Sequence, residues 1–217
     1  MMTSGKIELK YEVLDKGRIE ILDALAEFKN IFYLAGGTGL ALQIGHRISI
    51  DFDFFCFKPF DNEKLLERAK TIFLNNSIMV IQNELNTLTI LLDSEIKISF
   101  FKLDHSNILP LIDTQYFNLA QKREIAVMKL LELFRATYKD YVDMFYILKD
   151  TNLAKIISLA EKKHEEINVG VYLKALITND DIDDLPIVFR PGFEVSKKEV
   201  FSFIENETMK YIRRYKK

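Results

Sequence analysis

The order of elements along the chain restricts its fold more than any other feature, because the strand patterns are confined to the first half. Segments that alternate in polarity or are rich in β-branched and aromatic residues lie at 31–35, 48–57, 78–82, 87–92 and 96–103. Helical patterns without an intervening strand follow at 121–135, 138–149, 153–167, 171–177 and 197–217. Strands first and helices later predict an α+β protein. We expect an α/β core over 1–115 and a helical C-terminal domain over 116–217.

Three helical segments are expected among the strands. An amphipathic helix covers 16–30, a short one covers 40–44 before Gly45, and a third covers 61–75 behind a capping Asp61. The last three strand segments are joined by short turns that contain Asn or Asp. These turns predict an antiparallel meander.

Charge and cysteine content narrow the class of protein. A formal net charge of -2 argues against a protein that coats nucleic acid by bulk electrostatics, since such domains are usually strongly basic. The single cysteine, Cys56, cannot form an internal disulfide, and 1–14 alternates charged with apolar residues, unlike a signal peptide. No segment approaches the roughly 18 to 20 apolar residues that cross a bilayer. We therefore expect a cytoplasmic protein that does not enter the membrane.

Two aspartates, Asp51 and Asp53, alternate with apolar residues in the segment 48–54. Strict alternation predicts that the isoleucines and phenylalanines face one side, and that both aspartates face the other side with Ser49. Residues two apart on a strand have Cα atoms roughly 6.5 to 7 Å apart, so the carboxylates can converge on one cation and otherwise repel. Magnesium binds through one or two carboxylates plus substrate phosphates. The alternative is the solvated polar face of an edge strand.

A glycine-rich segment, Gly36-Gly37-Thr38-Gly39, lies between a predicted strand and a predicted helix. Glycines there would let phosphate oxygens approach the backbone N–H groups at the helix N-terminus. A tight turn that needs positive φ is the alternative. One short helix separates this segment from Asp51, so the glycines and the aspartates are expected on neighbouring strands.

The helical half contains further candidate residues. Lys129 lies among apolar residues and needs an anionic partner, either a protein carboxylate or a triphosphate. Asp140 and Asp143 lie one helical turn apart among aromatic residues, and a pair between Lys139 and Asp143 is the structural alternative. The histidines show no metal-ligand spacing, so each is expected either at the surface or in a position where its hydrogen bonds are satisfied.

Four blocks of this chain together resemble the AbiEii/AbiGii toxin family of nucleotidyltransferases. The blocks are 35–42 (AGGTGLAL), 45–55 (GHRISIDFDFF), Lys129 and 139–143 (KDYVD). The resemblance covers roughly residues 30 to 150. It implies a polymerase-beta-like fold with a mixed sheet, magnesium-dependent transfer of a nucleotide from a nucleoside triphosphate, and the toxin role in a type IV toxin–antitoxin or abortive-infection system. It also implies a cognate antitoxin and an acceptor, which is the 3′ end of tRNA for some relatives and protein for others.

The resemblance also implies roles for individual residues. Phosphate-binding and nucleotide-binding residues would be Gly36, Gly37, Thr38, Arg47, Ser49 and Lys129. Magnesium would be held by Asp51 and Asp53. The helical acidic residue of the family would be Asp140 or Asp143, which acts in catalysis together with Lys129 and the two magnesium ligands.

One position departs from the family pattern. Polymerase-beta-like sites usually carry a third carboxylate on a later strand, where this chain has Ser99. Three explanations stay open: Asp140 or Asp143 supplies the carboxylate, the acceptor hydroxyl loses its proton without a third ligand, or transfer activity is lost. A non-catalytic nucleotide-binding or protein-interaction module is therefore the rival function, and a nucleotidyltransferase that modifies protein is the third.

The last eight residues, 210–217, gather five cations and two tyrosines. Cations there could neutralise phosphates while the tyrosines stack on bases, which makes this segment the local candidate for an RNA contact. A basic helix end that complements the helix dipole is the alternative.

Overall fold

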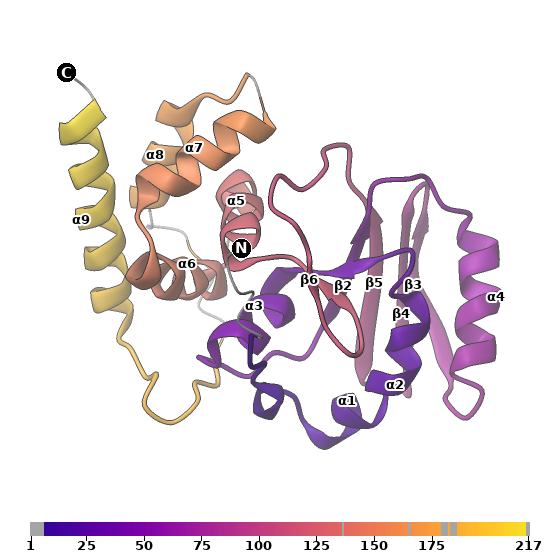
Figure 1. The fold of residues 1–217 in the computed structure, drawn as a ribbon. Coiled ribbons are helices and arrows are strands. Elements are labelled where there is room, and N and C mark those ends of the chain that lie inside the picture. Colours follow the sequence, from indigo (N-terminus) through magenta and orange to yellow (C-terminus); the bar gives the residue numbers. More distant parts are fainter. Residues whose placement is uncertain (1–6, 136, 165, 179–181, 183–185, 216–217) are drawn as a thin grey trace, which may run out of the picture.

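The computed structural model describes residues 7–135, 137–164, 166–178, 182 and 186–215 (Figure 1). Its helices and strands are, in chain order, α1 (Lys16–Glu20), α2 (Leu22–Leu25), β1 (Tyr33–Leu34), α3 (Gly36–Ile44), β2 (Phe52–Cys56), α4 (Asn62–Ile72), β3 (Ile78–Glu84), β4 (Thr87–Leu92), β5 (Ile96–Lys102), β6 (Ile112–Asp113), β7 (Asn118–Leu119), α5 (Lys122–Leu131), α6 (Tyr138–Asp150), α7 (Leu153–Lys163), α8 (Val169–Ile177) and α9 (Lys197–Tyr215). The predicted order of strands before helices is confirmed.

The described strands form one seven-stranded mixed sheet in the order β3-β4-β5-β2-β1-β7-β6. The hairpins β3–β4 and β4–β5 are antiparallel, as the short turns predicted. The strand β2 pairs parallel with β5 and antiparallel with β1, and β1 pairs parallel with β7. The α+β prediction with a mixed sheet and a helical C-terminal part is therefore confirmed.

The buried hydrophobic residues form two separate apolar cores. The first joins one face of β2, β4 and β5 to α2 and α4, and its largest side chains include Phe28, Phe54 and Phe100. The second lies among α5 to α9 and reaches β1 through Tyr33. Figure 1 shows α4 beside the meander and the later helices gathered on the other side of α3. None of the helices in the described part of the chain is both long and apolar enough to span a membrane.

The expected single helix over 16–30 is wrong, because the structure divides it into α1, α2 and a 3-10 turn. Within α1 the side chain of Arg18 is buried. Its guanidinium donates to the carbonyl oxygens of Ile50 at 2.6 Å and Glu95 at 3.1 Å. This orientation leaves Ile19 exposed, so the apolar periodicity of the sequence does not follow one helix face.

The expected strand over 48–57 begins later than predicted, at Phe52. Alternation holds within β2, where Phe52, Phe54 and Cys56 are buried, but Ile50 is exposed and Ser49 is buried. The cause lies in the backbone, because the N–H of Ile48 donates to the carbonyl of Val188 at 2.9 Å rather than to a sheet neighbour. Asp51 therefore directly precedes the strand, and Asp53 lies on it.

The division near residue 115 stays a prediction. The strands β6 and β7 lie on either side of that residue and pair with each other, and β7 also pairs with β1.

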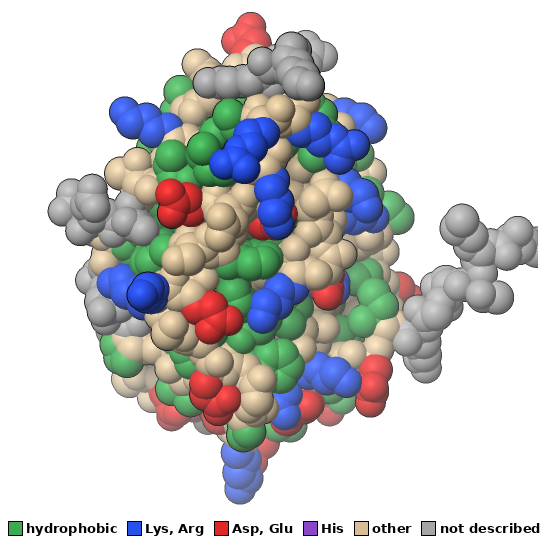
Figure 2. Space-filling model, turned by 90° about the vertical axis from the view of Figure 1, so that its left-hand side faces the viewer, with side chains coloured by type: hydrophobic (Ala, Val, Ile, Leu, Met, Phe, Trp, Pro, Cys, Tyr) green, Lys and Arg blue, Asp and Glu red, His purple; other side chains and the backbone are tan. Residues whose placement is uncertain are grey.

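On the side of the molecule formed by α9, cationic and anionic side chains are interspersed (Figure 2).

Candidate functional site

The first turn of α3 approaches the carboxylate of Asp53. The glycine-rich segment is itself the start of the helix rather than a separate turn, since α3 begins at Gly36. Gly36 has φ +63°, and a Cβ atom there would lie 2.7 Å from Asp53 Oδ2. No side chain caps the N-terminus of α3. Glycine is thus required for the approach, and the helix N-terminus stays available to an anion.

Gly37, Thr38 and Ser49 hold the chain that precedes Asp51. A Cβ atom on Gly37 would lie 2.6 Å from Nη2 of Arg47, so this glycine also permits a close approach. The buried hydroxyl of Thr38 hydrogen-bonds with Ser49 Oγ at 2.8 Å and with the carbonyl oxygen of Asp51. Thr38 and Ser49 therefore fix the backbone at Asp51.

The two aspartates differ in their surroundings. Asp51 forms an ion pair with Lys97 of β5, with 2.9 Å between Oδ2 and Nζ. Asp53 lies opposite Ser99 in the parallel register of β2 and β5. Burial and the charge of Asp51 raise the pKa of Asp53 to about 6, against the opposing charges of Lys97 and Lys129. The crowding expected from the sequence is present.

Asp143 is fully buried beneath the cleft and collects three cationic or hydrogen-bonding groups. Arg47 donates to it from Nε and Nη2, each at 2.8 Å. His46 Nε2 lies 2.7 Å from Oδ1, and Lys129 Nζ lies 2.7 Å from Oδ2. Burial alone raises the pKa of Asp143, but Arg47, Lys129 and the hydrogen bonds outweigh it and hold the pKa well below its usual range.

Lys129 is buried and pairs with both helical aspartates, so in this structure its anionic partners are protein carboxylates. Its Nζ lies 2.8 Å from Oδ1 of Asp140 and 2.7 Å from Asp143. The other oxygen of Asp140 accepts the backbone N–H of Thr137 at 2.8 Å and completes the capping box of α6. Burial lowers the pKa of Lys129, but the two carboxylates together raise it above its usual value. The lysine is therefore charged and held at the cleft.

Two adjoining cavities form the cleft. One of about 160 Å³ is polar and includes Arg47, Ser49 and Asp51 in its lining. The other, of about 580 Å³, has apolar walls that include Phe55, Phe101 and Met128. Four residues line both cavities: Gly37, Asp53, Lys129 and Asp140. The cleft thus joins a charged end to an aromatic end at the predicted site, while Asp143 lies behind it.

The residues fit a magnesium ion that arrives with phosphates. Among the described residues, no group of three or more His, Cys, Asp or Glu side chains is placed to hold a metal ion by itself. Asp51 and Asp53 offer two carboxylates, and magnesium commonly takes one or two of these with substrate phosphate oxygens. A Cβ atom on Gly36 would fill the space beside Asp53 Oδ2. Because glycine has no side chain, that space stays open to such a ligand.

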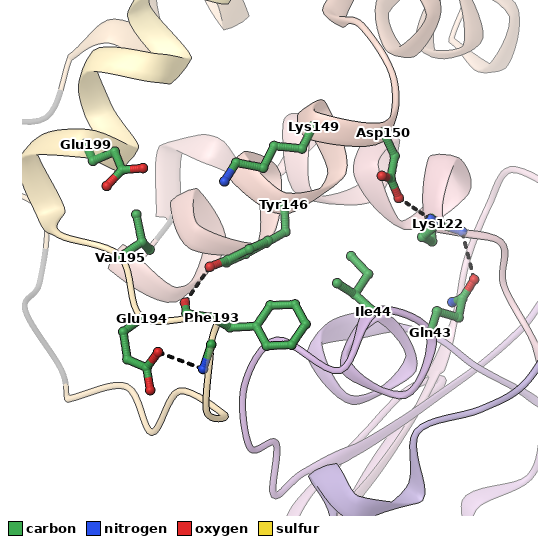
Figure 3. Close-up of a pocket in the computed structure, with 11 residues that line it drawn as sticks. Gln43, Ile44, Lys122, Tyr146, Lys149, Asp150, Phe193, Glu194, Val195 and Glu199 are labelled. Carbon is green, nitrogen blue, oxygen red and sulfur yellow. Dashed lines mark hydrogen bonds and ion pairs between the residues drawn. The ribbon is translucent and has the colours of Figure 1, made fainter.

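A separate cavity of about 480 Å³ lies at the other end of α3, among α5, α6 and the segment before α9 (Figure 3). Its Lys122 and Asp150 pair with each other, and the hydroxyl of Tyr146 donates to the carbonyl of Phe193. It contains no convergent pair of carboxylates, so we place the candidate active site in the cleft.

The sequence does not assign two residues, His46 and Lys97, to the site. His46, which the sequence places either at the surface or in the core with a hydrogen-bond partner, is fully buried and contacts Asp143; burial lowers its pKa against the opposing effect of that carboxylate. Its position next to Arg47 was the available signal. Lys97 received no role, and its pairing with Asp51 follows only from the register of β2 and β5.

Two solved structures resemble the fold of this chain. The fold resembles a crystal structure of JHP933 from Helicobacter pylori, with a TM-score of 0.55, 16% sequence identity, and coverage of 93% of this chain and 91% of that one. A second H. pylori crystal structure, of a protein assigned as a nucleotidyltransferase, gives a TM-score of 0.56 at 16% identity, covering 93% of this chain and 94% of that one. The chain therefore shares its fold with these two proteins.

The sequence comparisons define the family. The model of the nucleotidyl transferase AbiEii toxin, type IV toxin–antitoxin system, matches residues 20–209. The chain belongs to this family of nucleotidyl transferase toxins. It is also 31% identical to an uncharacterized protein of Aquifex aeolicus (strain VF5) in an alignment of 193 residues, with coverage of 82% of this chain and 90% of that protein.

Proposed function

We propose that the chain transfers a nucleotide from a nucleoside triphosphate to the 3′ end of tRNA or another RNA, with magnesium as the cofactor. One observation carries the proposal: Asp51, Asp53, the N-terminus of α3 and Lys129 converge on one cleft. Two carboxylates beside a helix N-terminus and a buried lysine match what a magnesium triphosphate needs.

Each residue has a role in this proposal. Asp51 and Asp53 hold the cation, which when bound would neutralise charge on the phosphates and align them for attack. The N–H groups at Gly36 and Gly37 receive phosphate oxygens. Lys129 exchanges part of its contact with Asp140 for the triphosphate, since both line the cleft.

Arg47 acts mainly by holding Asp143. Its Nε and Nη2 are bonded to that carboxylate, and Nη1 donates to the carbonyl of Ile48 at 3.2 Å. Arg47 also lines the polar cavity, so its charge contributes to the binding of an anion there.

The aromatic end of the cleft is where we place the base or the acceptor. Phe55 and Phe101 lie side by side on β2 and β5, with ring centroids 5.4 Å apart. Flat apolar side chains of this kind can stack on a nucleobase without selecting one base. Asp53 lies between this wall and the polar cavity, which is where a reacting phosphate would have to be.

A labelling experiment tests the function. The full chain is incubated with magnesium, cell extract and each of the four α-labelled nucleoside triphosphates in turn, and RNA and protein are then separated. We expect label in RNA, and we expect Asp51→Asn and Asp53→Asn to abolish it. Asp113→Asn is the matched control, because that carboxylate is exposed on β6 and pairs with Lys29.

The same experiment separates the rival functions. Label in protein would assign the chain as a protein-modifying nucleotidyltransferase. Magnesium-dependent binding of a triphosphate with no label in either fraction would assign a non-catalytic nucleotide-binding module, the reading that Ser99 beside Asp53 favours. The family of type IV toxin–antitoxin systems further supports a cognate antitoxin as partner, which would suppress the labelling when added.

A further inference from the structure

The buried side chain of Arg18 connects the two strands that meet at the candidate site. Its Nε donates to the carbonyl oxygen of Ile50 at 2.6 Å, and its Nη2 donates to the carbonyl oxygen of Glu95 at 3.1 Å. Ile50 directly precedes Asp51, and Glu95 directly precedes β5. Regular pairing of β2 with β5 begins only with Phe52. The guanidinium therefore bridges the two chain segments just before the point where their pairing starts.

The backbone that positions Asp51 at the cleft lacks two usual supports. It lies outside β2, and it is not anchored by burial, since Ile50 is 48% exposed and the side chain of Asp51 is 40% exposed. Peptide groups are planar, so a donor that fixes the carbonyl oxygen of Ile50 also fixes the N–H of Asp51. Thr38 holds the next carbonyl oxygen, that of Asp51 itself. The direction of the Asp51 carboxylate thus depends on two side-chain donors, Arg18 and Thr38.

Arg18 is held in place from its own helix. The residue is 2% exposed, and its Nη1 donates to the carboxylate of Asp15, which also accepts the backbone N–H of Arg18 as the N-cap of α1. Arginine presents its donors in a fixed planar fork, so a single lysine ammonium could not hold both carbonyl oxygens in the same way. The position of α1 is therefore transmitted to the peptide before Asp51 through one side chain.

We infer that Arg18 is a positioning residue for the proposed magnesium ligand Asp51. The inference rests on the proposed function of the cleft. It makes α1 part of the active site, although none of the described residues that line the two cavities of the cleft belongs to this helix. Arg18 acts through the peptide between Ile50 and Asp51 rather than by touching a substrate. A purely structural arginine would contribute to stability and leave the affinity for metal unchanged.

Binding of a metal complex tests the inference without measuring activity. Manganese(II) with inorganic tripolyphosphate serves as the probe, because the relaxation rate of water protons rises when this small complex attaches to the protein. The full chain is compared with Arg18→Met, which keeps the aliphatic stem but has no donors, and with Arg18→Ala, which leaves space for a free guanidinium ion. Leu65→Ala is the matched control, because Leu65 is buried in the apolar core on α4 and its truncation lowers stability away from the cleft.

We expect Arg18→Met and Arg18→Ala to bind the manganese complex about tenfold more weakly than the wild type. Loss of a group that orients a metal ligand typically costs roughly 10- to 100-fold in affinity. Guanidinium chloride, at a concentration well below that which unfolds the protein, should restore most of the affinity of Arg18→Ala, whereas sodium chloride at the same ionic strength should not. Leu65→Ala should bind the complex as the wild type does.

Wild-type affinity in the folded Arg18 variants would overturn the inference alone, and so would an equal loss in Leu65→Ala. A loss in Arg18→Ala that free guanidinium leaves unchanged would assign Arg18 to stability and overturn the inference as well. If the wild type binds no manganese complex, the proposed function is wrong and the inference is wrong with it. If neither variant folds, Arg18→Lys decides: its ammonium can hold only one of the two carbonyl oxygens, so wild-type affinity in that variant would overturn the inference.

Discussion

Arg47 and Asp143 form a two-pronged ion pair, with Nε and Nη2 each 2.8 Å from a different carboxylate oxygen, although 96 residues separate them in the chain. The pair joins the segment before β2 to α6. Asp143 also forms an ion pair with Lys129, so one buried carboxylate allows two cationic side chains to lie beneath the cleft. Such charges are tolerated in a protein interior only while the partner is present.

Asp143→Asn should therefore be strongly destabilising. The variant leaves Arg47 and Lys129 buried without their common anion, and loss of one partner of a buried pair costs about 3–5 kcal/mol. Urea unfolding measures the change. Asp150→Asn is the matched control, because Asp150 pairs with Lys122 at the surface and its loss should cost under about 1 kcal/mol. Equal effects of the two variants would contradict a central role for Asp143.

The metal-free protein should lose stability as the pH rises through the titration of Asp53. Its pKa is raised to about 6 in the folded state, against roughly 3.9 when unfolded, so the folded protein binds this proton more tightly. The resulting loss of folding free energy is absent below about pH 4, grows up to about pH 6 and persists above it. A shift of two units corresponds to at most about 3 kcal/mol.

Asp53→Asn removes that titration. In EDTA, the variant should be more stable than the wild type at pH 8 and equal to it near pH 4, as measured by chemical denaturation at both values. The same variant should lose magnesium-dependent binding of triphosphate. A variant that is less stable than the wild type at pH 8 would show that Asp53 is not a crowded, desolvated carboxylate.

Lys129→Met should weaken the binding of triphosphate while it keeps most of the packing of α5. Methionine replaces the aliphatic stem of the lysine, and Asp143 retains Arg47. We expect at least a tenfold loss of affinity by calorimetry, because a buried charge-assisted contact to phosphate is worth more than about 1.4 kcal/mol. Unchanged affinity together with an unchanged fold would restrict Lys129 to the internal pair.

Gly36→Ala should disrupt the site. The new Cβ would lie 2.7 Å from Asp53 Oδ2, and φ of +63° costs an L-residue roughly 1 kcal/mol. We expect loss of metal-dependent triphosphate binding in calorimetry. Gly17→Ala is the control, since its Cβ would meet its nearest neighbours at 3.7 Å. Wild-type binding by Gly36→Ala would exclude a ligand between α3 and β2.

The exposed arginines near the end of α9 test the expected RNA contact. Arg213 and Arg214 are exposed, while Tyr211 stacks on Tyr215 with ring centroids 4.6 Å apart. Arg213→Gln combined with Arg214→Gln should weaken RNA binding and flatten its dependence on salt by about one to two charges. Binding of triphosphate should stay unchanged. An unaltered salt dependence would assign these arginines to the helix dipole alone.

Most elements of the fold were predictable because their signals are local. The meander needed only alternating strands with short turns, and α4 begins behind the capping Asp61, whose carboxylate accepts the N–H groups of Glu63 and Lys64. The exceptions depend on distant partners. Arg18 in the first predicted helix is buried because it bonds to residues 32 and 77 positions away, which no local pattern reports.

The site followed the same rule. Asp51, Asp53 and the glycines could be proposed from their own segments, and Lys129 could be predicted to need an anion. The identity of that anion depends on the tertiary structure, in which both Asp140 and Asp143 contact Lys129. The sequence does not assign His46 and Lys97 to the site, because a single histidine or lysine forms no recognisable pattern. Only the sheet register and the helix packing bring the partner of each residue near.

The separation between Arg47 and Asp143 has a consequence for synthesis on the ribosome. Chains grow from the N-terminus at about 5–20 residues per second, so β2 and the glycines of α3 emerge well before α6. Until α6 docks, neither Arg47 nor Lys129 has the carboxylate that permits its burial. A nascent chain that ends before α6 therefore cannot assemble the cleft, and a nucleotidyl transferase toxin built in this way stays inert until most of it has been translated.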